Sequence, residues 1–364
     1  MANLMNALGL MSGTSLDGID AALIRTDGEA VVERGPAMTF PYSPAQRARL
    51  RAGLEAAVAM TQRDQRPGDL GALERDLTLW HADAVAQFRK AHDIQPDIIG
   101  FHGQTVLHRP AQALTVQLGD GRLLAAETGI QVVADMRAAD VAAGGQGAPL
   151  VPAYHAALAA GLAARPVAFV NIGGVANITF IARDGALLAF DTGPGNALMD
   201  DWALKHLGRA VDEGGALAAS GSPDEAMLEA LLAHPYFAAM PPKSLDRQTF
   251  AALTPNSLNP ANGAATLTAF TAHSIAAAAD WLEEMPEVWV ITGGGRHNPA
   301  LMGMLREVIP ARVIAAEEAG FDGDAMEAEA WGYLAVRSLK GLALSFPGTT
   351  KVDEPMTGGN WFAP

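Results

Sequence analysis

GLMSGTSLDGID, residues 9–20, places a polar, glycine-bearing loop between two short apolar runs. The runs at 7–11 and 19–24 have no helical period, so the segment predicts a strand, a glycine turn and a return strand. Gly13 and Gly18 would let the backbone approach a phosphate closely, because neither has a side chain. Consecutive backbone N–H groups in such a turn form a cradle for an anion.

The same loop carries two hydroxyls, Thr14 and Ser15, and one carboxylate, Asp17. A carboxylate beside a phosphate repels it unless a cation lies between them, and Mg²⁺ is often held by one or two carboxylates together with phosphate oxygens. The loop at 12–18 is therefore predicted to bind phosphate and Mg²⁺. An ordinary hairpin turn is the alternative, because one short motif is weak evidence.

A similar arrangement follows in the second half of the chain. Residues 167–172 are an apolar run that leads into the polar glycine turn at 171–174, and residues 177–182 read as the return strand. A further strand at 186–190 is joined through Arg183-Asp184-Gly185, which is a hairpin signal. The repetition predicts a duplicated domain plan.

Length and composition agree with two α/β domains. A chain of 364 residues is longer than one hydrophobic core usually grows. Its 49% of hydrophobic residues argue against disorder. The glycine cluster at 144–149 predicts the boundary, with one domain at 1–143 and the other at 144–364. The tail at 345–364 is expected to lie extended over the surface and to pack back on the first domain.

Several segments carry helical periodicity or a helix start signal. Ser43 is expected to cap a helix whose first residue is Pro44, and Ser222-Pro223-Asp224-Glu225 reads as a capping box with Pro223 at the first helical position. The helices are expected at 43–60, 69–92, 264–285 and 324–344, at about 150–163, after Ser222, and from Asn298-Pro299 onward.

Charge and cysteine content exclude several classes of protein. The net charge is −15 and basic residues form no run longer than a pair, so nucleic acid and anionic membrane surfaces are not expected partners. The absence of cysteine excludes disulfides, thiolate metal sites and a cysteine nucleophile. Residues 1–24 lack a basic segment and an unbroken apolar run, so they predict neither a signal peptide nor a membrane span, and a cytoplasmic location is expected.

Asp191 is the candidate catalytic carboxylate. It follows the predicted strand at 186–190 and precedes a helix, so its side chain could act as general base on a water or hydroxyl. Capping of the turn or of the helix is the alternative. Gly293-Gly294-Gly295, after the apolar strand at 287–292, could lie against a nucleotide base or ribose. Its spacing and late position argue against a dinucleotide fold.

Three polar residues are candidates for ligand contacts. His102 and Gln104 follow the predicted strand at 97–101 and could form hydrogen bonds with a polar ligand. Glu327 lies in the first turn of a helix, where stabilising the helix dipole is its default role and substrate contact the alternative. The sequence contains no H-x-x-x-H, G-x-S-x-G or Walker A motif, which argues against a zinc site, a serine hydrolase and a P-loop.

Eight blocks in this order resemble the anhydro-N-acetylmuramic acid kinases and cover nearly the whole chain. They are GLMSGTSLDGID (9–20), HGQT (102–105), GGQGAPLVP (144–152), NIGGVAN (171–177), FDTGPGN (190–196), PKS (242–244), TLT (266–268) and GGG (293–295). One departure is visible. The family usually has Thr-Gly-Arg-Glu after the Lys-Ser pair, whereas this chain has Leu245-Asp246-Arg247-Gln248, in a loop that could border the sugar pocket.

The resemblance implies an α/β fold of two duplicated ribonuclease-H-like, actin-like ATPase domains with a central cleft for ATP and sugar. It implies Mg²⁺ at Asp17, through water. The implied ATP contacts are Ser12, Gly13, Thr14, Ser15, Leu16, Asp17, Gly18, Gly173, Gly174, Asn177, Gly293, Gly294 and Gly295.

The resemblance further implies that Asp191 activates a water that opens the 1,6-anhydro bridge of 1,6-anhydro-N-acetylmuramic acid, while O6 is phosphorylated by ATP. The expected sugar contacts are His102, Gln104, Asp140, Gly195 and Glu327. A homodimer is also implied. Another sugar or carboxylate kinase of the superfamily, or a nucleotide-gated chaperone-like ATPase, is the alternative function.

Overall fold

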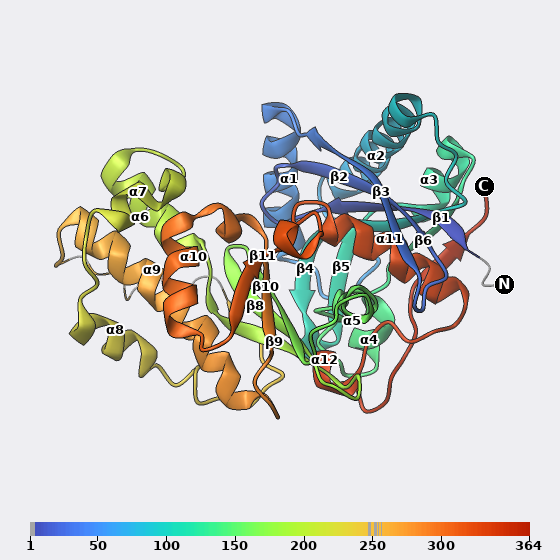
Figure 1. The fold of residues 1–364 in the computed structure, drawn as a ribbon. Coiled ribbons are helices and arrows are strands. Elements are labelled where there is room, and N and C mark those ends of the chain that lie inside the picture. The colour runs from blue at the N-terminus through green and yellow to red at the C-terminus, as the bar shows by residue number, and fades with distance from the viewer. Residues whose placement is uncertain (1–3, 247–248, 251–252, 254, 256) are drawn as a thin grey trace. The chain divides into compact units, whose positions relative to one another are not determined.

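The computed structural model describes residues 4–246, 249–250, 253, 255 and 257–364, and shows a mixed α/β protein with two sheets (Figure 1). Contacts divide the chain into unit 1, Met1–Gly161 with Ala325–Pro364, and unit 2, Leu162–Asp324. The expected boundary after residue 143 differs from this division. Helix α5 (Pro152–Ala160) contacts α11 (Met326–Leu339), and α11 packs on the first strand of the chain, so both helices belong to unit 1.

The unit 1 sheet has seven strands in the order β12-β6-β4-β1-β2-β3, with β5 paired to β4. The strands β1, β2 and β3 form an antiparallel meander, whereas β4 and β6 run parallel to β1. The tail therefore contributes an edge strand rather than only an extended segment. The bounds are β1 Met5–Ser12, β2 Gly18–Thr26, β3 Val32–Pro41, β4 Ile98–Arg109, β5 Leu114–Leu118, β6 Gln131–Ala134 and β12 Asn360–Phe362.

The unit 2 sheet has five strands in the order β11-β10-β7-β8-β9. Here β7, β8 and β9 form the antiparallel meander, and β10 and β11 run parallel to β7. The two sheets therefore share the strand order of a meander followed by two parallel strands. The bounds are β7 Val167–Ile172, β8 Val175–Ile181, β9 Leu187–Pro194, β10 Val288–Thr292 and β11 Arg312–Ala315.

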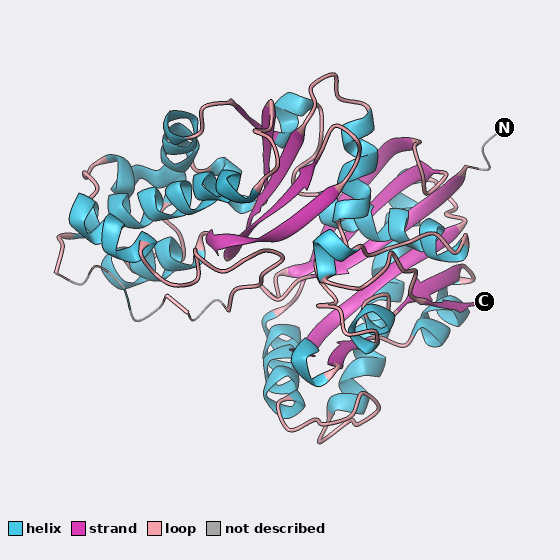
Figure 2. Cartoon of the chain, turned by 90° about the horizontal axis from the view of Figure 1, so that it is seen from below, coloured by secondary structure: helices cyan, strands magenta, loops and turns pink. Residues whose placement is uncertain are grey.

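Helices cover the sheets of both units (Figure 2). Ser43 caps α1 through a complete capping box, as expected, but the N-cap of α8 is Asp224 rather than Ser222. The predicted helix at 264–285 begins earlier, at Pro260, and becomes a 3₁₀ turn at Ala277. The other bounds are α1 Pro44–Ala57, α2 Leu70–His92, α3 Gly121–Thr128, α4 Ala138–Ala142, α6 Ala197–Leu207, α7 Ala216–Ala219, α8 Glu225–Leu232, α9 Pro260–Ala276, α10 Pro299–Val308 and α12 Pro347–Thr350.

Two strands are longer than the sequence predicts. β4 continues past Phe101 to Arg109 because its second half pairs with β5. β9 continues past Phe190 to Pro194 because β8 pairs with it along that length. Asp191 therefore lies inside a strand and not in a loop after one, which fixes its backbone more firmly.

Glycines allow α11 to lie directly on the unit 1 sheet. A Cβ added at Gly9 of β1 would overlap the carbonyl oxygen of Ala328, and one added at Gly100 of β4 would overlap the carbonyl oxygen of Trp331. The helix backbone thus touches the strand backbone at both positions. This contact fixes the height of the α11 side chains above β1 and β4.

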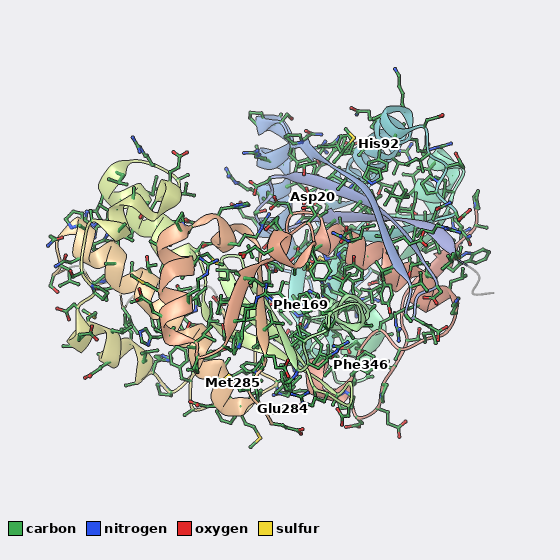
Figure 3. All side chains as sticks on the ribbon, in the orientation of Figure 1. Asp20, His92, Phe169, Glu284, Met285 and Phe346 are labelled. Carbon is green, nitrogen blue, oxygen red and sulfur yellow. The ribbon has the colours of Figure 1, made fainter. Side chains whose placement is uncertain are left out.

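Both faces of the unit 2 sheet are buried. Ala168 and Val170 of β7 belong to a hydrophobic cluster with Phe270 of α9. Phe169, labelled in Figure 3, lies between them and therefore faces the other side of the sheet, where its ring centroid is 5.8 Å from that of Phe321. Within the described part of the chain, no helix is both long and apolar enough to cross a membrane.

Candidate active site

The loop after β1 is anchored by hydrogen bonds that involve three buried residues, Ser12, Tyr42 and Gln104. Ser12 Oγ donates to Gln104 Oε1 at 2.7 Å and lies 2.8 Å from the hydroxyl of Tyr42. Gln104 Nε2 donates in turn to the carbonyl of Gly13 at 3.2 Å. Since both ends of the Gln104 amide are used within the loop, its visible role is to hold the loop rather than to face a ligand.

The tip of this loop presents oxygen atoms to solvent. Thr14, Ser15 and Asp17 are exposed, whereas the side chain of Leu16 is buried in the unit 1 core. Leu16 has φ of 59° and its N–H donates to the Gly13 carbonyl at 3.2 Å, which closes the turn. The buried leucine anchors the turn and leaves the two hydroxyls and the carboxylate available.

The two glycines of the loop have different roles. A Cβ at Gly13 would meet its first neighbour at 3.5 Å, so this backbone is open to an approaching ligand. A Cβ at Gly18 would lie 2.5 Å from the carbonyl oxygen of Phe40 on β3. Strand packing therefore explains Gly18 without any ligand.

His102 lies beside the loop in a tilted stack with the ring of Trp331. Its ring centroid is 4.5 Å from that of Trp331 on α11, and the guanidinium of Arg137 lies 4.9 Å from the centroid of the same ring. Nδ1 of His102 is 3.2 Å from the Ser12 carbonyl, and Nε2 is 3.3 Å from Arg137 Nη2. Burial and the charge of Arg137 hold the pKa of His102 well below its usual range. The ring is therefore neutral, and Nδ1 carries the proton and donates it in a hydrogen bond to the Ser12 carbonyl.

Arg137 is a site residue that the sequence did not reveal. Burial lowers its pKa to about 10, although the carboxylates of Glu327 and Asp140 act in the opposite direction. Its Nη1 donates to the carbonyl of Gly147 at 2.9 Å. The guanidinium of Arg137 beside His102 is a donor suited to a polar, anionic group of a ligand, and the exposed carboxylate of Glu327 can accept from a hydroxyl.

Asp140 has a different environment from the one expected of a sugar contact. The carboxylate is buried and accepts from the N–H of Gly147 at 2.5 Å and from the hydroxyl of Thr350 at 2.6 Å. It therefore holds the glycine cluster at 144–147 in place, and that cluster in turn carries the carbonyl bound by Arg137.

In unit 2, a row of polar residues crosses four strands at one register. Thr292 of β10 pairs with Asn171 of β7, Asn171 pairs with Asn177 of β8, and Asn177 pairs with Asp191 of β9. Residues paired across neighbouring strands lie on the same face of a sheet. Asn177, expected at ATP, is thus the direct neighbour of the candidate base.

Asp191 is positioned by three hydrogen bonds from residues 236–245. Its N–H donates to the carbonyl of Lys243 at 2.9 Å, and its own carbonyl accepts from the hydroxyl of Tyr236 at 2.5 Å. The N–H of Leu245 donates to Oδ2 at 2.7 Å. Burial raises the pKa of Asp191 from 3.8 to about 6, although the bond from Leu245 lowers it. The side chain is therefore both oriented and basic.

Two glycine turns pack together at the same end of this sheet. The N–H of Gly195 donates to the Gly174 carbonyl at 3.0 Å, and the N–H of Asn196 donates to the Gly173 carbonyl at 2.7 Å. A Cβ at Gly195 would overlap the carbonyl oxygen of Gly173, so the two turns touch backbone to backbone. Gly195 is therefore explained by packing.

The glycine turn at 293–295 joins the same group. Gly293 has φ of 71°, and a Cβ there would overlap the side chain of Asn171. Nη1 of the buried Arg296 donates to the Gly293 carbonyl at 2.9 Å and thereby holds the turn. A Cβ at Gly294, in contrast, would come no closer than 3.6 Å to a neighbour. Gly294 is the residue of this turn that leaves room for a ligand.

A cavity of about 790 Å³ lies on the opposite face of β9. Phe190 and Thr192, which flank Asp191 in the strand, line it together with the ammonium-bearing side chain of Lys243. Lys243 was known from the sequence only as part of a family block. The four residues that depart from the family pattern, Leu245-Asp246-Arg247-Gln248, follow soon after it. Arg247 and Gln248 lie outside the described residues, whereas Leu245 donates its backbone N–H to Asp191.

The chain matches the family model described as anhydro-N-acetylmuramic acid kinase over residues 5–364. An anhydro-N-acetylmuramic acid kinase of Rhodopseudomonas palustris (strain BisB18) is 57% identical over 360 residues, which cover 98% of this chain and 99% of that protein. One from Agrobacterium fabrum (strain C58) is 54% identical over 368 residues, 99% of each chain. A solved ROK hexokinase from Thermus thermophilus aligns with 91% of this chain and 100% of its own at 17% identity, with a TM-score of 0.38.

Proposed function

This chain belongs to the anhydro-N-acetylmuramic acid kinase family, and we propose that Asp191 is the general base of its reaction. The enzyme uses ATP to open the 1,6-anhydro bridge of 1,6-anhydro-N-acetylmuramic acid and to phosphorylate O6. The products are N-acetylmuramic acid 6-phosphate and ADP, which places the reaction in peptidoglycan recycling. The observation that carries the proposal for Asp191 is a buried carboxylate, oriented by Leu245, whose pKa is raised to about 6.

In the proposed mechanism, the Asp191 carboxylate takes a proton from the water whose oxygen bonds to C1 of the sugar. The C1–O6 bond breaks with its electron pair on O6, and O6 bonds to the γ-phosphorus as the bond to ADP breaks. Oδ2 accepts from the Leu245 N–H, so we assign the water proton to Oδ1. A carboxylate with a pKa near 6 is ionised at neutral pH and is a better proton acceptor than an exposed aspartate.

We assign the phosphate contacts to the exposed loop at 13–17 and to the turn at Gly173-Gly174, and the adenosine contact to the turn at 293–295. The open backbone at Gly13 and Gly294 supports both assignments. The exposed hydroxyls and carboxylate of the first loop are hard oxygen ligands that suit Mg²⁺. We therefore assign Mg²⁺ to Asp17, through water; the bound ion would neutralise phosphate charge.

We propose further that the two units are duplicated actin-like ATPase domains with a central cleft for ATP and sugar. The shared strand order of the two sheets supports the duplication. A cytoplasmic location agrees with the use of ATP, and a homodimer is the assembly that we expect.

Arg137 is the sugar contact that unit 1 supports best, and Arg137→Met is expected to raise KM for the sugar about 10- to 100-fold while leaving KM for ATP unchanged. A hydrogen bond to a charged group contributes roughly 1.5–3 kcal/mol, which corresponds to that range. Steady-state kinetics with each substrate varied would show the split. Arg122→Met is the matched control, because Arg122 also lies over an aromatic ring of unit 1, that of Phe362. Equal changes in both KM values would contradict the assignment.

The reaction is tested by mass spectrometry of the product formed from ATP, Mg²⁺ and 1,6-anhydro-N-acetylmuramic acid in oxygen-18 water. We expect the sugar to gain one phosphate and one labelled oxygen, because water supplies the oxygen at C1. A product with phosphate and without the label would refute water attack at C1. Preference for an ordinary hexose would refute the substrate.

A further inference from the structure

Residues 236–245 contact Asp191 at its N–H, its carbonyl and its carboxylate, as described above. We call Tyr236, Lys243 and Leu245 the Asp191 clamp. Residues 243–246 belong to no helix or strand, so sheet pairing does not hold Lys243 and Leu245 against the base. Other contacts must keep this part of the chain in place.

The side chain of Lys243 supplies such contacts. Its Nζ donates to the carbonyl of Tyr236 at 3.0 Å and to the carbonyl of Phe237 at 3.3 Å, which ties the two ends of the segment together. The ammonium also lies 4.6 Å from the ring centroid of Tyr236, 5.3 Å from that of Trp281 and 5.9 Å from that of Phe190, the residue before Asp191. A cation over several aromatic rings is attracted by each of them.

We propose that Lys243 is a positioning residue for the base: its ammonium closes the segment at 236–245, so that the Leu245 N–H stays on Oδ2 of Asp191 and Oδ1 is left for the water. The inference rests on the proposed role of Asp191. Lys243 does not need to touch substrate for this purpose, because it acts through the backbone of the segment that it closes.

In the described part of the chain, several charged and titratable groups lie near Asp191. Tyr236 and Lys243 come from the clamp, and burial together with the charge of Asp191 raises the pKa of the Tyr236 hydroxyl, which therefore stays protonated. On the other face of β9, His273 of α9 and Asp280 line the cavity. Asn177, the neighbour across β8, carries no charge. Loosening the clamp would remove the N–H from the ionised carboxylate and so disfavour its charged form.

The test is the pH dependence of kcat for the intact enzyme, Lys243→Met and Lys243→Arg. For Lys243→Met we expect kcat to fall about 10- to 100-fold, as a slightly misplaced base would cause. We also expect the acid limb of the pH profile, where kcat rises as the base ionises, to move upward by roughly 0.5 to 1 pH unit, because a hydrogen bond to the carboxylate is lost. Lys243→Arg keeps the cation and should restore the limb. Lys205→Met is the matched control, since Lys205 also lies over an aromatic ring, that of Trp202.

A lower kcat with an unmoved limb would overturn the proposal, because a merely structural lysine would reduce the active fraction without changing the base. If Lys243→Met does not fold, Tyr236→Phe removes the bond to the Asp191 carbonyl and should shift the limb in the same direction; an unmoved limb would again contradict the proposal. Full activity in Asp191→Asn would instead refute the base itself. The two failures are therefore distinguishable.

Discussion

Asp191→Asn is expected to lower kcat about 10²- to 10⁴-fold, the range that a positioned general base contributes. The amide keeps the size of the side chain and can still accept from the Leu245 N–H, but it cannot take the water proton. Product formation in oxygen-18 water would show loss of both label and phosphate, because bridge opening releases the O6 that attacks ATP. Asp184→Asn, in the exposed hairpin turn between β8 and β9, is the control and should leave the rate unchanged.

The role of Asp191 also predicts how activity depends on pH. Because burial raises the pKa of Asp191 to about 6, the carboxylate is protonated and inactive below that pH and ionised above it. Activity of the unaltered enzyme should therefore rise between about pH 5 and pH 7, as general base catalysis requires. The residual activity of Asp191→Asn should lack this limb. A limb that persists in the variant would assign the titration to another group.

Gly9→Ala is expected to destabilise unit 1 by about 3 kcal/mol or more, because the new Cβ would overlap a backbone carbonyl of α11 that cannot rotate away. For a unit of this size the loss corresponds to a fall in Tm of roughly 6–12 °C. Differential scanning calorimetry would measure it. The helix would also be pushed away from β1, which would displace Trp331 and the His102 stack and raise KM for the sugar.

Gly71→Ala provides the comparison within the same unit. Gly71 lies in the first turn of α2, where a Cβ would meet its first neighbour at 3.7 Å, an ordinary contact. Alanine is the better helix former, so this variant should be as stable as the unaltered protein or more so. Equal Tm values for the two variants would contradict close helix-to-strand contact at Gly9.

Local signals in the sequence predicted much of the secondary structure correctly. Residues 167–172 carry an apolar run without helical period, and β7 has those bounds. Ser43 and Pro44 are a start signal that depends only on neighbouring residues, and α1 begins there. The sequence did not predict the extensions of β4 and β9, because each extension forms by pairing with another strand. The residues of the extended strand do not by themselves indicate that pairing.

The sequence predicted those parts of the candidate site in which glycines and carboxylates occur together in short motifs. Arg137 and Lys243 were not recognised as site residues, because each is a single basic residue whose importance comes from burial and from carbonyls elsewhere in the chain. Gly18 is the converse case: it stands in a glycine motif of the kind that binds phosphate, and its Cα also lies against the carbonyl of Phe40. A glycine motif does not distinguish space for a ligand from contact with a strand.

The division of the chain into units has a consequence for biosynthesis. Leu162–Asp324 is continuous, so a nascent chain holds every residue of unit 2, including Asp191, before residues 325–364 leave the ribosome. Unit 1, in contrast, lacks α11 and β12 until then, and the edge of β6 has no partner. Exposed edges pair readily with other chains. Translation therefore leaves unit 1 open to aggregation for longer than unit 2.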